Sequence, residues 1–283
     1  MIDVSLLKYF LCFIFATVFI WFLIQKSIKE KYIPEKYNKN DYNHEYSIVT
    51  WNIQKFPWSL KSFKDNKIYD IVKSNSIILL QECFDETYES LESCFPDYYI
   101  CRGNLKGMNI MNSGLVILSK FPIEDIMFHE YKNYNPFSFE LFSEKGFLSA
   151  NIKINKEKTI KVINTHLQSS DFERFDNNAI LQLKELIDYM NILNYNNIPY
   201  ITGGDFNIDI NDFNNISNIK DLYHSKQPTI YINFSTSHTS NKLIKDYEPL
   251  IFDYFISKIK METPIVMQID YSDHNPVKTY FFI

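Results

Sequence analysis

The N-terminal part of the chain is one long apolar run, whereas the rest alternates short apolar runs with polar stretches. Residues 6–24 are almost wholly apolar, and about 20 such residues in a helix span a hydrocarbon layer of ~30 Å. Bulky Trp21, Phe22 and Leu23 stand where a signal peptide would carry small residues before its cleavage site. The pattern therefore predicts a single-pass, uncleaved membrane anchor over residues 1–25, with a cleaved signal peptide as the alternative.

Charged residues around this run predict which side of the membrane the remaining chain occupies. Lysines are frequent after the run and scarce before it, so the positive-inside rule places the C-terminal flank in the cytoplasm. Two glycosylation sequons, at Asn215 and Asn233, are compatible with the opposite, lumenal orientation. Residues 26–44 are polar and rich in Lys, Asn and Tyr, and we interpret them as a tether to a folded domain.

From residue 45 onward the pattern is that of a mixed α/β domain. Helices are predicted over residues 63–73 and 177–193, and the second carries an apolar stripe with helical spacing. We expect an α/β (α+β) fold in which two mixed β-sheets pack face to face with helices outside, as one domain over residues 45–283. The predicted strands, all rich in Ile, Val, Phe and Tyr, are 46–52, 77–81, 98–101, 114–119, 147–154, 159–165, 200–203, 252–257 and 277–282.

Polar motifs lie at the ends of several of these apolar runs. The five motifs are Thr50-Trp51-Asn52, Gln81-Glu82, Asn164-Thr165-His166, residues 203–207 (Gly-Gly-Asp-Phe-Asn) and residues 272–276 (Ser-Asp-His-Asn-Pro). Carboxylate, amide and imidazole groups at the ends of buried strands are costly unless they are paired or bind metal. Each motif alone also fits an ordinary turn or surface loop, but the series predicts one convergent site for a hard cation and a phosphate.

Oxygen-bearing side chains in these motifs predict a magnesium site. Glu82 offers a carboxylate and Asn52 an amide, and Mg²⁺ prefers oxygen ligands with only one or two carboxylates. Asp273 is a third candidate ligand, and Mn²⁺ is an alternative to Mg²⁺. Asp205 and Asn207 follow two glycines that allow a sharp turn, so both can point the same way and orient a water or a phosphate oxygen.

Two histidines predict acid–base chemistry at the same site. His274 is a candidate general base, and Asp253, flanked by large apolar residues, is the candidate that fixes its tautomer. His166 ends its strand and is a candidate hydrogen-bond donor to a phosphate oxygen, with a purely structural role as the alternative. Other hydrolytic or nucleotide-binding chemistries fit worse, because the sequence contains no GxSxG elbow, no P-loop and no HExxH motif.

Composition limits which partners this protein can bind. Hydrophobic residues make up 46% of the 283 residues and charged residues 22%, as in a globular protein with a sizeable core. The net charge of -5 disfavours broad, sequence-independent binding to duplex nucleic acid, although it is compatible with a nuclease. The four cysteines lack zinc-site spacing, so free thiols are expected, with a Cys94–Cys101 disulfide as the alternative.

Taken together, the motifs resemble the endonuclease/exonuclease/phosphatase superfamily of magnesium-dependent phosphodiesterases over roughly residues 46–283. The resemblance implies a four-layered α/β sandwich. It also implies that Glu82 is the principal magnesium ligand, with Asn52 and Asp273 close to the metal. By the same resemblance Asp205 and Asn207 orient the attacking water and the phosphate. His274 is then the general base, oriented by Asp253, and His166 contacts the phosphate.

The segments between these motifs are similar to those of neutral sphingomyelinases. The similarity lies in Lys145-Gly146-Phe147, in the Thr-His-Leu-Gln-Ser sequence of residues 165–169 and in residues 52–58. It implies a phospholipid substrate, sphingomyelin for preference. A membrane-tethered endonuclease or DNA-repair phosphodiesterase is the alternative, because Asn112-Ser113-Gly114-Leu115 resembles a segment of pancreatic-type deoxyribonucleases. A degenerate, non-enzymatic member acting as a membrane scaffold is a third and weaker alternative.

Overall fold

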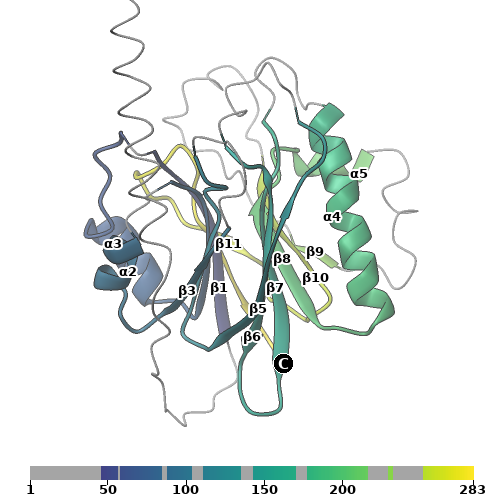
Figure 1. Ribbon diagram of the computed structural model, residues 1–283, viewed down its shortest axis with the longest axis horizontal. Coiled ribbons are helices and arrows are strands. Elements are labelled where there is room, and N and C mark those ends of the chain that lie inside the picture. Colours follow the sequence, from purple (N-terminus) through teal and green to yellow (C-terminus); the bar gives the residue numbers. More distant parts are fainter. Residues whose placement is uncertain are drawn as a thin grey trace, which may run out of the picture. The chain divides into compact units, whose positions relative to one another are not determined.

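The computed structural model describes residues 46–56, 58–84, 88–103, 111–134, 143–169, 177–215, 229–231 and 251–283 (Figure 1). All of them belong to one compact unit. The predicted anchor over residues 1–25 and the tether over residues 26–44 lie outside the described residues. Within the described part of the chain, no helix has the length and apolar character needed to cross a membrane.

The first sheet holds six strands in the order β11-β12-β1-β2-β4-β3. Its centre is mixed, because β1 pairs in parallel with β2 and antiparallel with β12. The strands are β1 (Tyr46–Lys55), β2 (Ile77–Cys83), β3 (Tyr99–Arg102), β4 (Val116–Ser119), β11 (Ile265–Val266) and β12 (Val277–Phe281).

The second sheet also holds six strands, in the order β5-β6-β7-β8-β10-β9. Here β7 and β8 are parallel, whereas β6 and β10 run antiparallel to their neighbours. The strands are β5 (Ile123–Glu130), β6 (Gly146–Lys153), β7 (Thr159–His166), β8 (Tyr200–Asp205), β9 (Thr229–Tyr231) and β10 (Asp253–Ser257).

Helices cover the outer faces of the two sheets (Figure 1). Helices α2 (Asn66–Lys73) and α3 (Tyr88–Cys94) lie on the first sheet, and α4 (Asn177–Tyr195) and α5 (Ile210–Asn215) on the second. The layers are therefore helix, sheet, sheet and helix, and the predicted pair of mixed sheets flanked by helices is confirmed.

Apolar side chains fill both faces of each sheet. In β2, Ile77 and Leu79 belong to the core between the sheets, and Ile78 and Leu80 belong to the core beneath α2 and α3. Successive strand residues point to opposite faces, so a strand buried on both sides reads as a continuous apolar run. That is why the sequence pattern located β2 well.

Edge elements differ from the prediction. The pattern predicted no strand at β5, which is mostly exposed and carries the charged sequence Ile-Glu-Asp-Ile-Met-Phe-His-Glu. Edge strands are often charged, because this blunts pairing with other chains.

Helix α2 begins at Asn66 rather than at residue 63, since Asp65 caps it by accepting a hydrogen bond from the Lys67 backbone N–H. Cys83, Cys94 and Cys101 are free thiols, so the alternative Cys94–Cys101 disulfide is absent.

Candidate active site

The candidate site lies where the ends of strands from both sheets meet. Asn52 is near the end of β1 and Glu82 near the end of β2, and these strands are parallel neighbours. His166 and Asp205 are the last residues of β7 and β8, and they lie opposite each other in the register. Asp253 opens β10 directly opposite Asp205, because β10 runs antiparallel to β8. Strand order thus delivers polar residues from distant parts of the sequence to one place.

Asn52 joins the two sheets at this point. Its Nδ2 donates hydrogen bonds to Glu82 Oε1 and to Asp205 Oδ2, both at 3.0 Å. Its Oδ1 accepts a hydrogen bond from the Gln54 backbone N–H at 3.1 Å. Asn52 is buried, and its side-chain N–H groups hold the two carboxylates in place.

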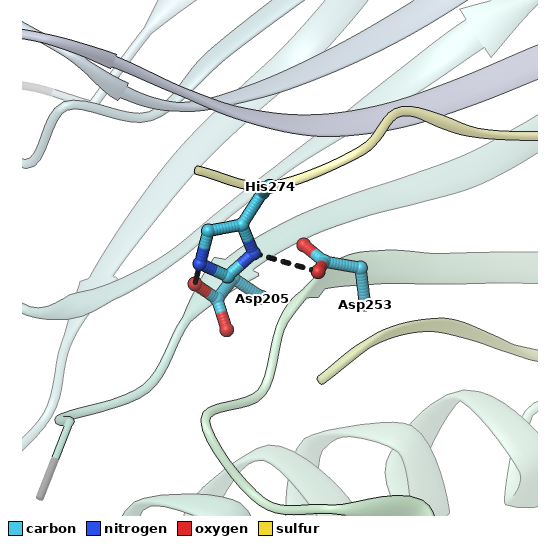
Figure 2. Close-up of side chains that lie close together, drawn as sticks. All are labelled: Asp205, Asp253 and His274. Atoms are coloured by element: carbon cyan, nitrogen blue, oxygen red, sulfur yellow. Dashed lines mark hydrogen bonds and ion pairs between the residues drawn. The ribbon is translucent and has the colours of Figure 1, made fainter. Parts of the chain in front are cut away.

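His274 forms a tight pair with Asp253 and faces Asp205 (Figure 2). Its Nδ1 lies 2.8 Å from Asp253 Oδ2, and its Nε2 lies 3.6 Å from Asp205 Oδ2. All three side chains are buried. A carboxylate at Nδ1 fixes the tautomer of an imidazole and leaves Nε2 to exchange a proton.

Burial and mutual charge shift the ionisation of this trio. Burial raises the pKa of Asp205 to about 7, although the charge of His274 opposes the shift. Burial lowers the pKa of His274, but the carboxylates of Asp253, Asp205 and Asp273 outweigh it and hold that pKa well above its usual value. Protons therefore bind readily to a site in which several carboxylates crowd together.

Glu82 and His166 complete the central group. Glu82 takes the left-handed region with φ 49°, which is uncommon for a residue other than glycine and is typical of functional sites. Burial raises its pKa, opposed by the Asn52 hydrogen bond and by Lys145. His166 Nε2 lies 3.6 Å from Asp205 Oδ2 and 3.9 Å from Glu82 Oε1.

Lys145, which the sequence marked only as part of the Lys145-Gly146-Phe147 similarity, is also a residue of the site. Its Nζ lies 3.1 Å from His166 Nε2, and the side chain is buried. An ammonium group can only donate, so the His166 ring nitrogen that faces it accepts. Burial, together with the charges of Lys145 and His274, lowers the pKa of His166 well below its usual value. The predicted hydrogen bond from His166 to a phosphate stays a prediction.

Asp273 and Asn207 lie at the margin of this group. Asp273 Oδ2 accepts a hydrogen bond from Gln54 Nε2 at 3.3 Å, so Gln54 connects it to Asn52. Asn207 donates its backbone N–H to Asp205 Oδ1 at 2.9 Å and its side-chain Nδ2 to the Leu167 carbonyl at 2.8 Å. The structure thus brings together Asn52, Glu82, His166, Asp205, Asp253 and His274. Asn207 bonds Asp205 directly, and Asp273 is linked to the group through Gln54.

A second group of buried polar residues ties the sheets together beneath the site. Gln81 Nε2 donates to Asn164 Oδ1 at 2.6 Å and to Thr50 Oγ1 at 3.0 Å. Asn164 Nδ2 donates to the carbonyls of Leu80 and Val116 at 2.8 and 2.9 Å. Because Gln81 precedes Glu82 and Asn164 lies two residues before His166, this group fixes the two strand ends relative to each other.

A close backbone contact sets the position of Asp205. A Cβ on Gly204 would collide with the Thr165 carbonyl oxygen of the neighbouring strand. A glycine is therefore required one residue before Asp205, where β7 and β8 approach closely. This supports the sequence-based argument that the glycine pair shapes the backbone before Asp205.

The donor set fits a hard divalent cation. The Glu82 carboxylate and Asp205 share Asn52 Nδ2 as a donor, and Asp205 belongs with Asp253 and His274 to a group whose ligand atoms lie within 4.8 Å of one another. Buried carboxylates this close repel one another unless a cation or a proton compensates them. Carboxylate and amide oxygens are ligands that Mg²⁺ and Mn²⁺ accept.

Comparisons with known proteins agree with this arrangement. A sequence model of the Endonuclease/Exonuclease/phosphatase family matches residues 49–244. The chain is 26% identical over 275 residues to Sphingomyelinase C 2 of Leptospira interrogans, a match that covers 84% of this chain and 43% of that protein. The chain therefore spans less than half the length of this curated relative.

Two solved structures share the fold. A variant of beta toxin from Staphylococcus aureus with bound magnesium ions superposes with a TM-score of 0.60 at 21% identity, covering 84% of this chain and 99% of that one. TDP2 from D. rerio, complexed with a single strand DNA product, superposes with a TM-score of 0.61 at 14% identity, covering 85% and 100%. At such identities the likeness concerns the fold alone.

Proposed function

Because the chain belongs to the endonuclease/exonuclease/phosphatase family, we propose that it is a metal-dependent phosphodiester hydrolase acting on a phospholipid, with sphingomyelin as the preferred substrate. The observation that carries the proposal is the Asp253–His274 pair facing Asp205, with Asn52 bridging Asp205 to Glu82. This arrangement combines a proton acceptor, a group that orients it and a cluster of oxygen ligands, as metal-assisted hydrolysis requires.

In this proposal Glu82, Asn52 and Asp273 would hold the cation, with magnesium as the first choice and manganese as the alternative. When bound, a divalent cation offsets the negative charge of the phosphate and of the nearby carboxylates, which brings the pKa of His274 down toward the range of a base. Asn52 keeps the Glu82 carboxylate in place through its 3.0 Å hydrogen bond.

His274 takes the proton of the attacking water. Asp253 accepts from Nδ1 at 2.8 Å, so Nε2 is the nitrogen that receives the proton, and the Asp253 carboxylate stabilises the resulting imidazolium. Nε2 points toward Asp205 (Figure 2), and Asp205 with Asn207 orients the water for in-line attack. The water oxygen bonds to phosphorus as the bond from phosphorus to the ceramide oxygen breaks, and the proton on His274 passes to the departing alkoxide.

In this proposal Lys145 and His166 are the candidate contacts of the phosphate. Lys145 carries a positive charge in a buried position next to His166. A buried cation stabilises charge that develops on phosphate oxygens more strongly than a solvated one does. Lys145 therefore joins His166 as a candidate phosphate contact.

Two considerations favour a lipid over a nucleic acid. The curated relatives are named sphingomyelinase C, and the apolar run over residues 1–25 is a proposed single-pass anchor that would keep the domain at a membrane, on the cytoplasmic side. A nucleic-acid substrate is the second candidate, because the fold is shared with TDP2 in complex with a single strand DNA product.

Parallel assays of the full chain with magnesium test the substrate. Phosphocholine release from sphingomyelin vesicles and nicking of supercoiled plasmid are measured side by side, with His274→Ala as the blank. We expect phosphocholine release without nicking. Nicking that His274→Ala abolishes, with no lipid turnover, would assign the chain to the nuclease branch of the family.

A further inference from the structure

An aromatic stack leads from the candidate site to the surface. The ring of Phe84, two residues after Glu82, stacks on Phe56 with ring centroids 5.5 Å apart, and Phe56 stacks on Trp58 at 5.2 Å. Phe84 is buried, whereas the exposed fraction of Trp58 is 73% and that of Leu60 is 102%. We call Phe56, Trp58, Ser59, Leu60 and Lys61 the rim loop.

The base of the rim loop is fixed to the site. Lys61 Nζ donates to the carbonyl of Ile53, the residue after Asn52, at 2.8 Å, and lies 5.2 Å from the centre of the Tyr271 ring. A turn is closed by the Ser59 backbone N–H, which donates to the Phe56 carbonyl at 2.9 Å. Trp58 therefore lies within a closed turn and Leu60 directly after it, next to the end of the strand that carries Asn52.

The chemistry of the rim loop fits the lipid–water boundary. Single exposed apolar residues are ordinary, but here an exposed tryptophan and an exposed leucine stand two positions apart in one loop. Residues 56–64 also contain two lysines and no acidic residue, in a chain of net charge -5. Tryptophan and lysine are typical of segments that lie in a membrane interface, with the indole at headgroup level.

A nucleic acid fits the same loop less well. Bases stack on aromatic faces, and one face of Trp58 is already covered by Phe56, with the two rings 5° from parallel. Leu60 has no ring on which a base could stack, yet it is the more exposed of the two apolar side chains. The transfer of an exposed leucine side chain from water into acyl chains is favourable in free energy.

We propose that the rim loop inserts into the surface of a phospholipid bilayer and seats the candidate active site against the lipid headgroups. The proposal rests on the proposed function in that it names the partner surface of the same site. It places Trp58 and Leu60 at the boundary between headgroups and acyl chains, with Asn52 and Glu82 above the headgroup layer. A substrate headgroup then needs to move little to reach the site.

Tryptophan fluorescence of the full chain tests the insertion directly. The chain has three tryptophans, Trp21, Trp51 and Trp58, and Trp51 is fully buried with its Nε1 donating to the His274 carbonyl. In a Trp21→Phe background, Trp58 is therefore the tryptophan that lipid can reach. The probe is vesicles of equal parts sphingomyelin and phosphatidylcholine, with and without bromine on the acyl chains.

We expect brominated vesicles to quench the exposed-tryptophan emission and to protect it from iodide in the water. Trp58→Phe in the same background should abolish the difference between brominated and plain vesicles. Emission that iodide quenches while brominated lipid leaves it unchanged would overturn the proposal. Protection from iodide by a single-stranded oligonucleotide, without lipid quenching, would overturn it in favour of a nucleic-acid surface.

Turnover ratios supply the second readout. For Trp58→Ala combined with Leu60→Ser, we expect the ratio of vesicle sphingomyelin turnover to bis(p-nitrophenyl) phosphate turnover to fall about 10-fold. The matched control is Tyr195→Ala combined with Ile192→Ser, two exposed apolar positions on α4, which should keep the parent ratio. An equal fall in both pairs would contradict docking by the rim loop. If the parent turns over neither substrate, the proposed function fails, whereas the quenching result still decides the docking.

Discussion

At the scale of single residues, the site depends on side chains whose partners come from far along the chain. Asn52 bonds Glu82 and Asp205 at once, and His274 bonds Asp253. Sequence reasoning proposed these residues because polar groups at the ends of apolar runs are costly without partners. Lys145 and Gln54 did not stand out as costly buried groups in the sequence, since isolated lysine and glutamine side chains are ordinarily exposed. Only the packing of the two sheets places them at the site.

Replacing Asp253 by asparagine tests the orientation of His274. Asp253→Asn removes the charge next to Nδ1, so we expect the pKa of His274 to fall and its preferred tautomer to change. Turnover should drop by about 10²–10⁴-fold. The measurements are kcat and the NMR titration of the His274 ring. Asp70→Asn, at an exposed position on α2, is the control. An unchanged His274 titration would contradict the assigned pairing.

The ionisation of the site predicts how stability depends on pH in magnesium-free buffer. His274 has a folded-state pKa raised above its usual value of 6.5, so the folded state binds its proton more tightly than the unfolded chain does. Its contribution is complete below pH 6.5 and is lost as the pH rises through the raised value. Because the Asp205 pKa is raised to about 7, ionisation of Asp205 also makes stability fall as the pH rises, up to that pH. The lowered pKa of His166 has the opposite effect, so that below pH 6.5 it makes stability rise with pH.

Thermal unfolding therefore should show stability falling as the pH rises above 6.5. Added magnesium should raise the unfolding temperature most at the higher pH, because metal binding competes with protons for the same groups. The control is His274→Gln, which should flatten the fall. Stability that increases with pH over this range in magnesium-free buffer would count against the described charge arrangement.

At the scale of elements, buried strands were predictable and exposed ones were not. Strand β2 is a continuous apolar run, and its position follows from sequence alone. Strand β5 carries Glu124, Asp125 and Glu130 on an edge, and such a segment has neither apolar alternation nor a continuous apolar run. The pairing of β7 with β8, which sets His166 opposite Asp205, is a long-range choice that no local pattern encodes.

The buried Gln81–Asn164 pair should contribute to the stability of the fold and to the alignment of the site residues at the ends of β2 and β7. Asn164→Ala removes one acceptor of the Gln81 amide, which keeps Thr50 Oγ1 as a partner, and it removes the donor to the carbonyls of Leu80 and Val116. We expect the free energy of unfolding to fall by about 1–3 kcal/mol, as for other buried groups left unsatisfied. Turnover per folded molecule should also fall, because the ends of β2 and β7 lose a common anchor.

Urea unfolding and active-site-normalised turnover measure these two effects. The control is Asn151→Ala on β6, which removes an exposed hydrogen bond to Asp125 and should change the free energy of unfolding by less than about 0.5 kcal/mol. Equal losses in the two variants would mean that the inter-sheet pair has no special role.

At the scale of the whole molecule, the order of the five motifs carried more information than any one of them. Each motif fits an ordinary loop by itself, yet the two sheets bring the motifs to one place. Family membership follows from the match over residues 49–244, and the substrate is the part that remains a proposal. Surfaces around the site, such as the rim loop, lie outside the five motifs, so the motifs do not specify the leaving group.

Magnesium dependence of diester hydrolysis tests the central claim most directly. Phosphocholine release by the full chain is measured against magnesium concentration after treatment with a chelator, for the parent and for Glu82→Gln. We predict no turnover in chelator and full recovery with magnesium. Glu82→Gln should need at least about 10-fold more magnesium for half of its maximal rate. Turnover that persists in chelator, or identical magnesium curves for the two proteins, would contradict a metal-dependent site built on Glu82.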